Sequence, residues 1–200
     1  MKKTLALILI LIAGFCVYWF MLRSKKASKA DTSETPIAQA NHSAVFNKSV
    51  DAVIAAYLTA KDGLTKNDTA AAKMGTTQMI AALDLIDMKE LAKDSNAVIE
   101  TAQASIQDVK ANAESLLRQT SIDEMRKDFS AMTDMMYPAF FSAVKYEGPR
   151  LYFYHCNMAF NNQGANWITN INEPDNPYMG GLAPDCSELK DSIAGLSLHN

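Results

Sequence analysis

Side chains able to bind a soft metal gather near the end of the chain, in the stretch YHCNM at residues 154–158. A second cysteine, Cys186, follows thirty positions after the first, and Met179 lies between the two. Thiolate and thioether sulfur suit Cu(I), whereas Zn(II) prefers four ligands from Cys, His or carboxylate groups, so zinc fits this set less well. The candidate metal ligands are Cys156, Met158 and Cys186, with His155 and Met179 as further ligands.

The spacing of these residues matters because residues two apart on a strand project to the same side. If the segment is extended through Met158, its thioether and the Cys156 thiol face one way and His155 faces the other. His155 can join them only if the strand bulges or breaks.

Two cysteines in an exported domain also have a structural interpretation. A disulfide between Cys156 and Cys186 would stabilise the fold by about 3 to 4 kcal/mol in the chain-entropy treatment, and oxidising compartments favour it. Unpaired core thiols are a third interpretation. An oxidised pair cannot act as thiolate ligands, so the residues alone leave these alternatives open.

Catalysis is the least favoured interpretation. His155 beside Cys156 resembles a base next to a nucleophile, but neighbours on a strand point apart. The sequence has no glycine-rich phosphate loop, GxSxG elbow or HExxH helix. We therefore expect no enzyme, with no catalytic or cofactor-binding residue.

These residues need a scaffold, and apolar residues recur every three or four positions through most of the chain before them, which predicts helices. The first predicted helix covers residues 45–64. A second begins after the capping pair Asn67-Asp68, a third after Asp94-Ser95, and a fourth after a capping box at residues 121–124. Short polar turns between them favour an all-α fold, a four-helix antiparallel bundle with a C-terminal loop or short-strand module.

The faces of two of these helices lead to specific expectations. Met125, Met132 and Met136 of the fourth helix are spaced as core filler, and Pro138 is expected to kink it. The second helix is expected to bury Ala71, Met74, Gln78, Ala81, Leu85 and Met88.

Beyond residue 147, the aromatic run at residues 151–156 predicts a strand, residues 166–170 a partner for it, and residues 186–193 a short closing helix. Residues 161–164 have the composition of a turn.

The N-terminus predicts a membrane anchor. Residues 5–22 carry no charge, and basic residues flank them on both sides. The first thirty residues hold six basic and no acidic side chains, so the remaining 13 basic and 22 acidic residues have a net charge of −9. An acidic body of this kind argues against nucleic acid as a partner. We expect a single-pass inner-membrane protein whose soluble domain faces the periplasm.

The sequence thus predicts four regions: a signal anchor at residues 1–24, a flexible linker at 25–42, a helical bundle at 43–147, and a Cys/Met-containing C-terminal module at 148–200 packed on the bundle. His42, at the end of the linker, is expected to be solvated.

The tail resembles a bacterial domain family of unknown function, found in anchored or exported proteins and at the C-terminus of some adaptor subunits of copper and heavy-metal efflux pumps. The matching motifs are Tyr152 with Cys156-Asn157-Met158-Ala159, then Gly164-Ala165-Asn166-Trp167, then Asn176-Pro177-Tyr178-Met179-Gly180, then Cys186. Three positions depart from the family pattern: Asn157 replaces a proline, Ala183 a methionine and Ser187 a glycine.

The resemblance covers about Phe46 to Ile193 and implies a helical bundle with a metal-associated tail. It carries over Cys156, Met158 and Cys186 as ligands, and it implies either that Met179 substitutes for the missing methionine or that this member binds metal poorly. It therefore favours Cu(I) binding, for sequestration or hand-over in metal homeostasis or with an efflux complex. The alternative is a non-catalytic structural or interaction domain with a Cys156–Cys186 disulfide.

Overall fold

The computed structural model describes residues 41–172, 175–180 and 186–193. The predicted anchor and nearly all of the predicted linker lie outside these residues. Residues 38–200 form one compact unit, and every described residue belongs to it. None of the described helices combines the length and the apolar character needed to cross a membrane.

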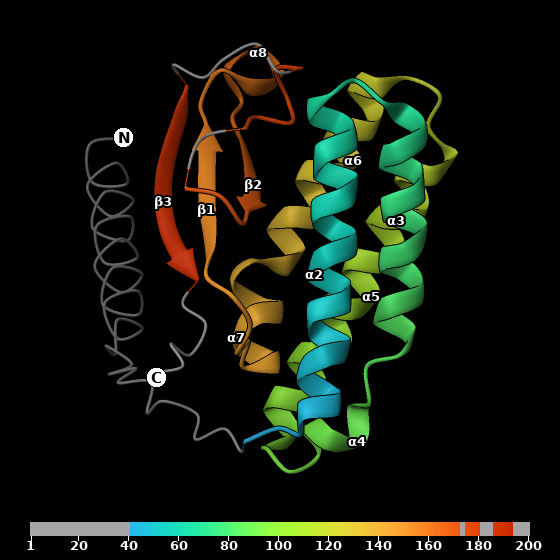
Figure 1. The fold of residues 1–200 in the computed structure, drawn as a ribbon, viewed down its shortest axis with the longest axis vertical. Helices are drawn as coiled ribbons and strands as arrows, with labels where there is room; N and C mark the ends of the chain where they lie inside the picture. The colour runs from blue at the N-terminus through green and yellow to red at the C-terminus, as the bar shows by residue number, and fades with distance from the viewer. Residues whose placement is uncertain (1–40, 173–174, 181–185, 194–200) are drawn as a thin grey trace, which may run out of the picture. The chain divides into compact units, whose positions relative to one another are not determined.

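Four long helices make up most of the described chain, as the periodicity predicts (Figure 1). Their bounds are α2 at Ala44–Thr65, α3 at Thr69–Asp84, α5 at Asn96–Arg118 and α6 at Ile122–Met135. The short helix α4, Met88–Leu91, lies in the connection between α3 and α5. Figure 1 shows α2 and α3 side by side and antiparallel, joined by a three-residue turn at 66–68.

Side-chain caps start three of these helices. Ser43, Asp68 and Ser95 accept hydrogen bonds from backbone N–H groups in the first turns of α2, α3 and α5. The predicted capping box at residues 121–124 is wrong: Ser121 directly precedes α6, but its side chain makes no capping hydrogen bond. Glu124 is held instead by Lys127, whose ammonium lies 2.7 Å from the carboxylate.

The buried face of α3 differs from the prediction. Met74 and Leu85 are exposed, and the residues that face the core are Ala72, Gly75, Thr76, Met79, Ala82 and Leu83. The cause is close helix packing: a Cβ placed on Gly75 would come within 2.3 Å of the Ala60 backbone nitrogen on α2. Small residues, rather than the large apolar ones, therefore mark the contact between α2 and α3.

The fourth predicted helix changes geometry where Pro138 interrupts it. A π-helical segment, η1 at Met136–Phe140, follows α6, and α7 at Phe141–Val144 continues from it. Tyr137 has non-helical φ and ψ, as expected one residue before a proline. The methionines predicted to fill the core, Met125, Met132 and Met136, are fully buried.

The C-terminal part forms a three-stranded antiparallel sheet in the order β2-β1-β3. The strands are β1 at Leu151–Cys156, β2 at Ala165–Thr169 and β3 at Ser187–Ile193, with the one-turn element α8, Ala159–Asn162, between β1 and β2. The two predicted strands are confirmed. The predicted closing helix at residues 186–193 is wrong, because this segment pairs with β1 as an edge strand.

Buried polar contacts join the sheet to the bundle. The Tyr57 hydroxyl of α2 lies 2.7 Å from the Thr133 hydroxyl of α6 and accepts a hydrogen bond of 3.1 Å from the Ile168 amide of β2. Burial raises the pKa of Tyr57 well above the ordinary range, so it remains a neutral phenol in this contact. The fold is mostly helical with a small sheet, and the all-α expectation was too narrow for the C-terminal region.

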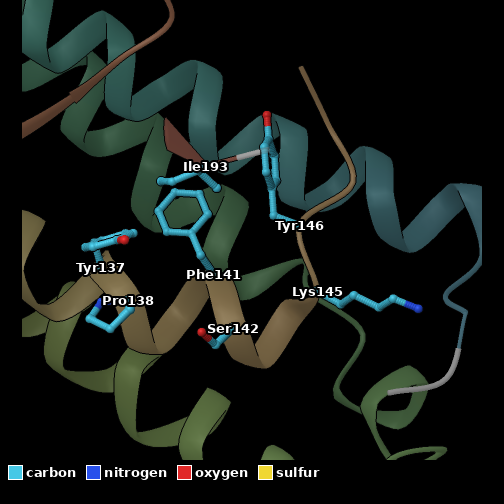
Figure 2. Close-up of a pocket in the computed structure, with 7 residues that line it drawn as sticks. All are labelled: Tyr137, Pro138, Phe141, Ser142, Lys145, Tyr146 and Ile193. Atoms are coloured by element: carbon cyan, nitrogen blue, oxygen red, sulfur yellow. The ribbon is translucent and has the colours of Figure 1, made fainter. Parts of the chain in front are cut away.

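A pocket of about 290 Å³ opens where the helical region meets the end of β3 (Figure 2). Its lining includes Tyr137 of η1, Phe141 of α7, Tyr146 and Ile193, the last residue of β3. Pro138, Ser142 and Lys145 complete the lining, and Ile193 forms one wall of the pocket.

Candidate functional site: a disulfide-centred C-terminal module

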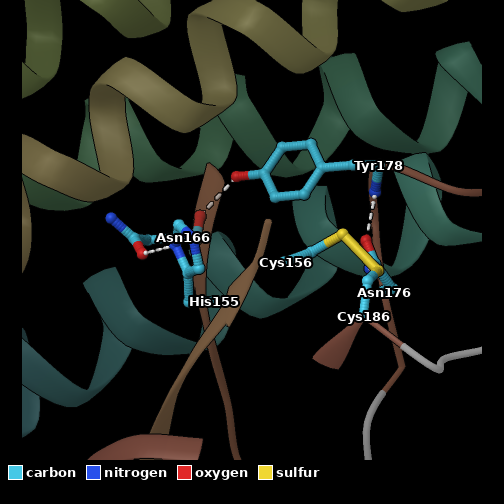
Figure 3. The surroundings of a disulfide bond; sticks show 6 residues. All are labelled: His155, Cys156, Asn166, Asn176, Tyr178 and Cys186. Carbon is cyan, nitrogen blue, oxygen red and sulfur yellow. Dashed lines mark hydrogen bonds between the residues drawn. A yellow bond between two sulfur atoms is a disulfide. The ribbon is translucent and has the colours of Figure 1, made fainter. Parts of the chain in front are cut away.

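The two cysteines of the C-terminal module are joined in a disulfide (Figure 3). Cys156 ends β1, and Cys186 directly precedes β3, so the bond links two adjacent antiparallel strands at the point where Cys156 pairs with Ser187. The Cys156 side is fully buried and Cys186 is 8% exposed. The bond therefore fixes the start of the edge strand to the end of the central strand.

The loop before Cys186 contributes a polar group to the disulfide. The Asn176 side-chain amide donates to the Cys186 sulfur over 3.3 Å, and the oxygen of the same side chain accepts from the Tyr178 amide at 2.9 Å. Asn176 is buried, so both ends of its amide are satisfied inside the protein. Residues 176–178 thus form an asparagine-centred turn that packs on the disulfide (Figure 3).

Tyr178 connects this turn to the sheet and the core. Its hydroxyl donates to the Asn166 carbonyl of β2, and its ring lies edge-on to Trp167, with centroids 6.1 Å apart. Burial raises the pKa of Tyr178 well above its usual range. Trp167 and Tyr178 are both buried.

His155 lies on the opposite side of β1 from Cys156, as strand alternation predicts (Figure 3). Its Nδ1 lies 2.8 Å from Asn166 Oδ1, and Asn166 Nδ2 donates over 2.8 Å to Asp134 Oδ1 of α6. Asp134 can only accept when ionised, so the Asn166 amide is oriented with its oxygen toward the histidine. Nδ1 must then carry the proton in the neutral imidazole, and the lone pair is on Nε2.

Left-handed backbone follows β1 closely. Phe160, Asn161 and Asn162 have φ values of 52°, 59° and 68°, and Gly164 has a φ of 84°. Asparagine and glycine tolerate this region, whereas Phe160 is strained there. The Phe160 ring contacts Tyr178 edge-on at a centroid distance of 5.4 Å, which offsets part of that strain. The predicted turn at residues 161–164 is confirmed.

Gly164 also makes room for His155. A Cβ at this position would come within 2.7 Å of His155 Cε1 and 2.9 Å of Nε2. The imidazole edge that carries the lone pair therefore lies directly against the backbone of the turn.

The two methionines proposed as ligands occupy different places. The strand ends at Cys156, so Met158 lies in the following turn with 53% of its surface exposed, and the extended geometry expected for Cys156 and Met158 is not present. Met179 follows the asparagine-centred turn and packs, partly buried, against the core. The structure brings Cys156 and Cys186 together and places His155 on the other side of the strand.

The donor set in this oxidised form does not fit a soft cation, because sulfurs joined to each other are not thiolates. In the described ranges, no group of three or more His, Cys, Asp or Glu side chains is arranged to hold a metal ion. The ligand set inferred from the sequence therefore requires the reduced pair.

Two buried basic residues that the sequence analysis did not single out attach the loop at residues 175–180 to the bundle. Lys61 of α2 is 1% exposed and pairs with Asp175 and, at 2.9 Å, with Asp62. Arg126 of α6 donates from Nε to the Pro177 carbonyl at 2.7 Å and from Nη2 to the Leu64 carbonyl at 3.1 Å. A basic residue on the apolar stripe of a predicted helix is the sequence signal that could have identified them.

His42 is also placed differently from the prediction. It is 8% exposed, its Nε2 lies 3.5 Å from Asp94 Oδ2, and its ring lies against Phe46 with centroids 4.5 Å apart. The expectation of a solvated linker histidine is wrong because the segment before α2 folds against α4 and the α4–α5 connection: Asp94 of the connection lies next to His42, and Ser43 N donates to Glu90 of α4 at 2.9 Å.

Comparison with known proteins bears on the helical part. Neither the curated proteins nor the solved structures contain a match to the chain. One family model matches and covers the helices from within α2 to the end of α7, stopping before β1 and the disulfide. The resemblance drawn from the tail is thus supported in its helical portion, and the link to exported proteins and efflux adaptors remains an expectation. A domain of the family described as "Protein of unknown function (DUF3347)" is found at residues 53–145.

Proposed function

We propose that this protein is a membrane-anchored, non-catalytic domain of an oxidising compartment, the periplasm, where it serves as a structural or interaction module. The observation that carries the proposal is the buried bond between Cys156 and Cys186. Disulfides persist in exported proteins and are rare where thiols are kept reduced. The uncharged stretch at residues 5–22 would supply the anchor in the inner membrane.

The contacts around the disulfide support a structural role. The bond, the Asn176 turn and the Tyr178 side chain connect β1, β2 and the loop before β3, and Lys61 and Arg126 hold that loop on the bundle. Both cysteines are buried. A buried, well-supported bond of this kind suits a brace that keeps one surface of the domain in a fixed shape.

A second candidate function is binding of Cu(I) by the reduced protein, for sequestration or hand-over. The observation in its favour is that the fold itself brings Cys156 and Cys186 together, with Cα atoms 4.7 Å apart, so reduction would leave two thiols able to reach one ion. Met158 and Met179 are the thioethers available nearby in sequence. His155 has its Nε2 lone pair oriented by the Asn166–Asp134 relay, as in many metal-binding histidines, but it faces the other side of β1.

One experiment separates the two candidates. Thiols are blocked by alkylation in intact cells before lysis, and the mass of the purified full chain then shows whether Cys156 and Cys186 were free. In the same preparation, copper bound per chain is measured by elemental analysis, with Cys16→Ser as the background because Cys16 lies outside the module.

Unmodified Cys156 and Cys186 without bound copper would support the structural proposal. Alkylated cysteines in the exported protein would overturn it. Reduced protein that competes with a Cu(I) chelator, and loses this ability in Cys156→Ser, would support the second candidate instead.

A further inference from the structure

We infer that β3 is a strand held by the disulfide, which separates from β1 when the Cys156–Cys186 bond is reduced while the helical bundle and the β1–β2 pair stay folded. The inference goes beyond the proposed role as a brace, because it assigns the bond a local effect that a change in redox state can reverse. It does not depend on whether the domain binds a metal.

The first observation is that β3 is poorly buried. Its five inner residues, Glu188 to Ser192, are all exposed, and only the two end residues of the strand are partly covered. In contrast, β2 buries four of its five residues. A strand that removes little apolar surface from water gains little from the hydrophobic effect.

The second observation is the position of β3 in the sheet. Among the described strands it pairs only with β1, and the register shifts between Phe153 and Tyr154, where β3 carries an extra residue, Lys190. A bulge interrupts the ladder of backbone hydrogen bonds. The net gain from each remaining bond is modest compared with the entropic cost of ordering each residue of the strand.

The third observation concerns the side-chain contacts between β3 and the other described residues. At the far end of the strand these are the hydrogen bond from the Tyr137 hydroxyl to Asp191 and the position of Ile193 in the wall of the pocket (Figure 2). At its near end the covalent bond at Cys186 holds the strand beside β1. Removing that bond leaves the pairing dependent on a short, interrupted ladder.

The chemistry requires a dithiol reductant. Its thiolate attacks the Cys186 sulfur, the less buried of the two, and forms a mixed disulfide while Cys156 leaves as a thiolate and takes up a proton. The second thiol of the reductant then displaces Cys186. Two electrons and two protons pass to the protein, and the reductant leaves as a cyclic disulfide. Exchange with an oxidised dithiol reverses the step.

Separation of β3 would change the surface in two ways. The second edge of β1 would lose its partner, and the pocket that contains Tyr137, Phe141 and Tyr146 would lose the wall formed by Ile193. The reduced protein would therefore present an open strand edge next to the pocket, whereas in the oxidised protein β3 pairs with that edge and Ile193 forms part of the pocket lining.

Hydrogen–deuterium exchange of the full chain in detergent micelles tests this inference. Cys16→Ser is used as the background, and the protein is compared before and after treatment with dithiothreitol, with intact mass confirming the gain of two hydrogen atoms. The expected result is at least fivefold faster exchange in the peptide covering residues 187–193, with less than twofold change in peptides covering β2 and α5.

An acceleration below fivefold in β3 would overturn the inference. Equal loss of protection in α5 would also overturn it, because the bond would then support the whole fold. The double variant Cys156→Ser/Cys186→Ser should exchange rapidly in β3 with or without dithiothreitol. Because the main comparison uses protein that has folded with its disulfide, the test still decides if this variant fails to fold.

Discussion

The orientation of the His155 imidazole is the most specific chemical feature of the C-terminal module. The carboxylate of Asp134 fixes the amide of Asn166, and that amide in turn fixes the proton of His155 on Nδ1. Free imidazole favours neither nitrogen strongly enough to guarantee this choice, so the relay determines it. The lone pair on Nε2 then lies against the turn at Gly164, where only a residue without Cβ fits.

We predict that Asn166→Ala changes the tautomer of His155. In the wild-type protein the neutral ring should carry its proton on Nδ1, and in Asn166→Ala the Nε2–H form should gain population at least severalfold, because the acceptor at 2.8 Å is lost. Long-range proton–nitrogen correlation NMR distinguishes the two forms. Asp134→Asn is the informative control, since it keeps the shape but allows the Asn166 amide to rotate. An unchanged tautomer in both variants would contradict the relay.

At the level of single residues, the sequence indicated which residues come together better than it indicated where each side chain lies. The sequence singles out Cys156 and Cys186 because cysteine is rare in this chain and its chemistry is distinctive, and the structure brings these two residues together. Their oxidation state could not be deduced, since a disulfide and a metal site require the same proximity. Met158 was misplaced because its predicted geometry assumed that the strand continued beyond Cys156, whereas the strand ends at Cys156 and Met158 has right-handed helical backbone angles in the following turn.

Among the secondary-structure elements, α2 and α3 form the closest pair, and glycine makes the approach possible. A Cβ on Gly75 would lie 2.3 Å from Ala60 N, and one on Gly63 would lie 2.4 Å from Ala72 N. Both neighbours are backbone atoms, which cannot move aside as a flexible side chain can. The two glycines lie on opposite helices, so each helix approaches the other at a point where its partner has no side chain.

We predict that Gly75→Ala destabilises the protein by about 3 kcal/mol, the upper end of the range for overpacking. Helix propensity alone would change stability in the opposite direction, by about 1 kcal/mol, so the sign of the effect identifies the cause. Urea unfolding followed by circular dichroism measures it. The control is Ala81→Gly at an exposed position of α3, which should cost about 1 kcal/mol. A neutral or stabilising Gly75→Ala would show that the helices are not in such close contact.

The attachment of β3 should depend on pH through Tyr137. Its hydrogen bond to Asp191, together with partial burial and the charge of that carboxylate, raises the pKa of Tyr137 to about 12. A pKa that is higher in the folded state means that the phenol stabilises the fold while protonated. This contribution is fully present below the ordinary tyrosine pKa of about 10 and is lost as the pH rises toward 12.

Ultraviolet difference titration of wild type against Tyr137→Phe measures this effect. The difference spectrum should isolate one phenol that ionises near pH 12, and Asp191→Asn should lower that midpoint toward 10. A midpoint that stays near 10 in the wild type would show that the hydrogen bond does not form in solution.

The elements were predictable to the extent that their signals are local. The helices of the bundle have a period of three to four residues and polar caps within their own sequence, and β1 and β2 are rich in aromatic and β-branched residues. The strand β3, SELKDSI, has no such pattern, since nearly all its side chains face solvent. Its structure comes from pairing with β1 and from a bond to Cys156 thirty positions away, and a local window contains neither.

At the scale of the whole molecule, buried charged side chains attach the C-terminal module to the bundle. Lys61 is almost completely buried on α2, and its ammonium lies between Asp62, whose side chain is about half exposed, and Asp175 of the loop, whose side chain is 23% exposed. The Asp175 Oδ1 atom is buried without a hydrogen bond from any described residue. The ammonium is thus the main compensation for the charge of Asp175.

We predict that Lys61→Met destabilises the protein by about 3 kcal/mol, because it leaves the Asp175 charge uncompensated in a largely buried place. Asp175→Asn should recover part of this loss when combined with Lys61→Met, giving a coupling energy of about 1 to 3 kcal/mol in a double-mutant cycle measured by urea unfolding. The control is Lys110→Met, which breaks an exposed pair with Asp84 and should cost less than about 1 kcal/mol.

The sign of the coupling decides between two descriptions of the molecule. If the module is attached through the ion pair, removing Asp175 after Lys61 has been replaced relieves an unpaired charge, and the double variant is more stable than Lys61→Met alone. If apolar packing of Trp167 and Tyr178 is sufficient by itself, the two substitutions act independently and their effects add. Additive effects would mean that Lys61 and Asp175 are neighbours in the fold without holding its two parts together.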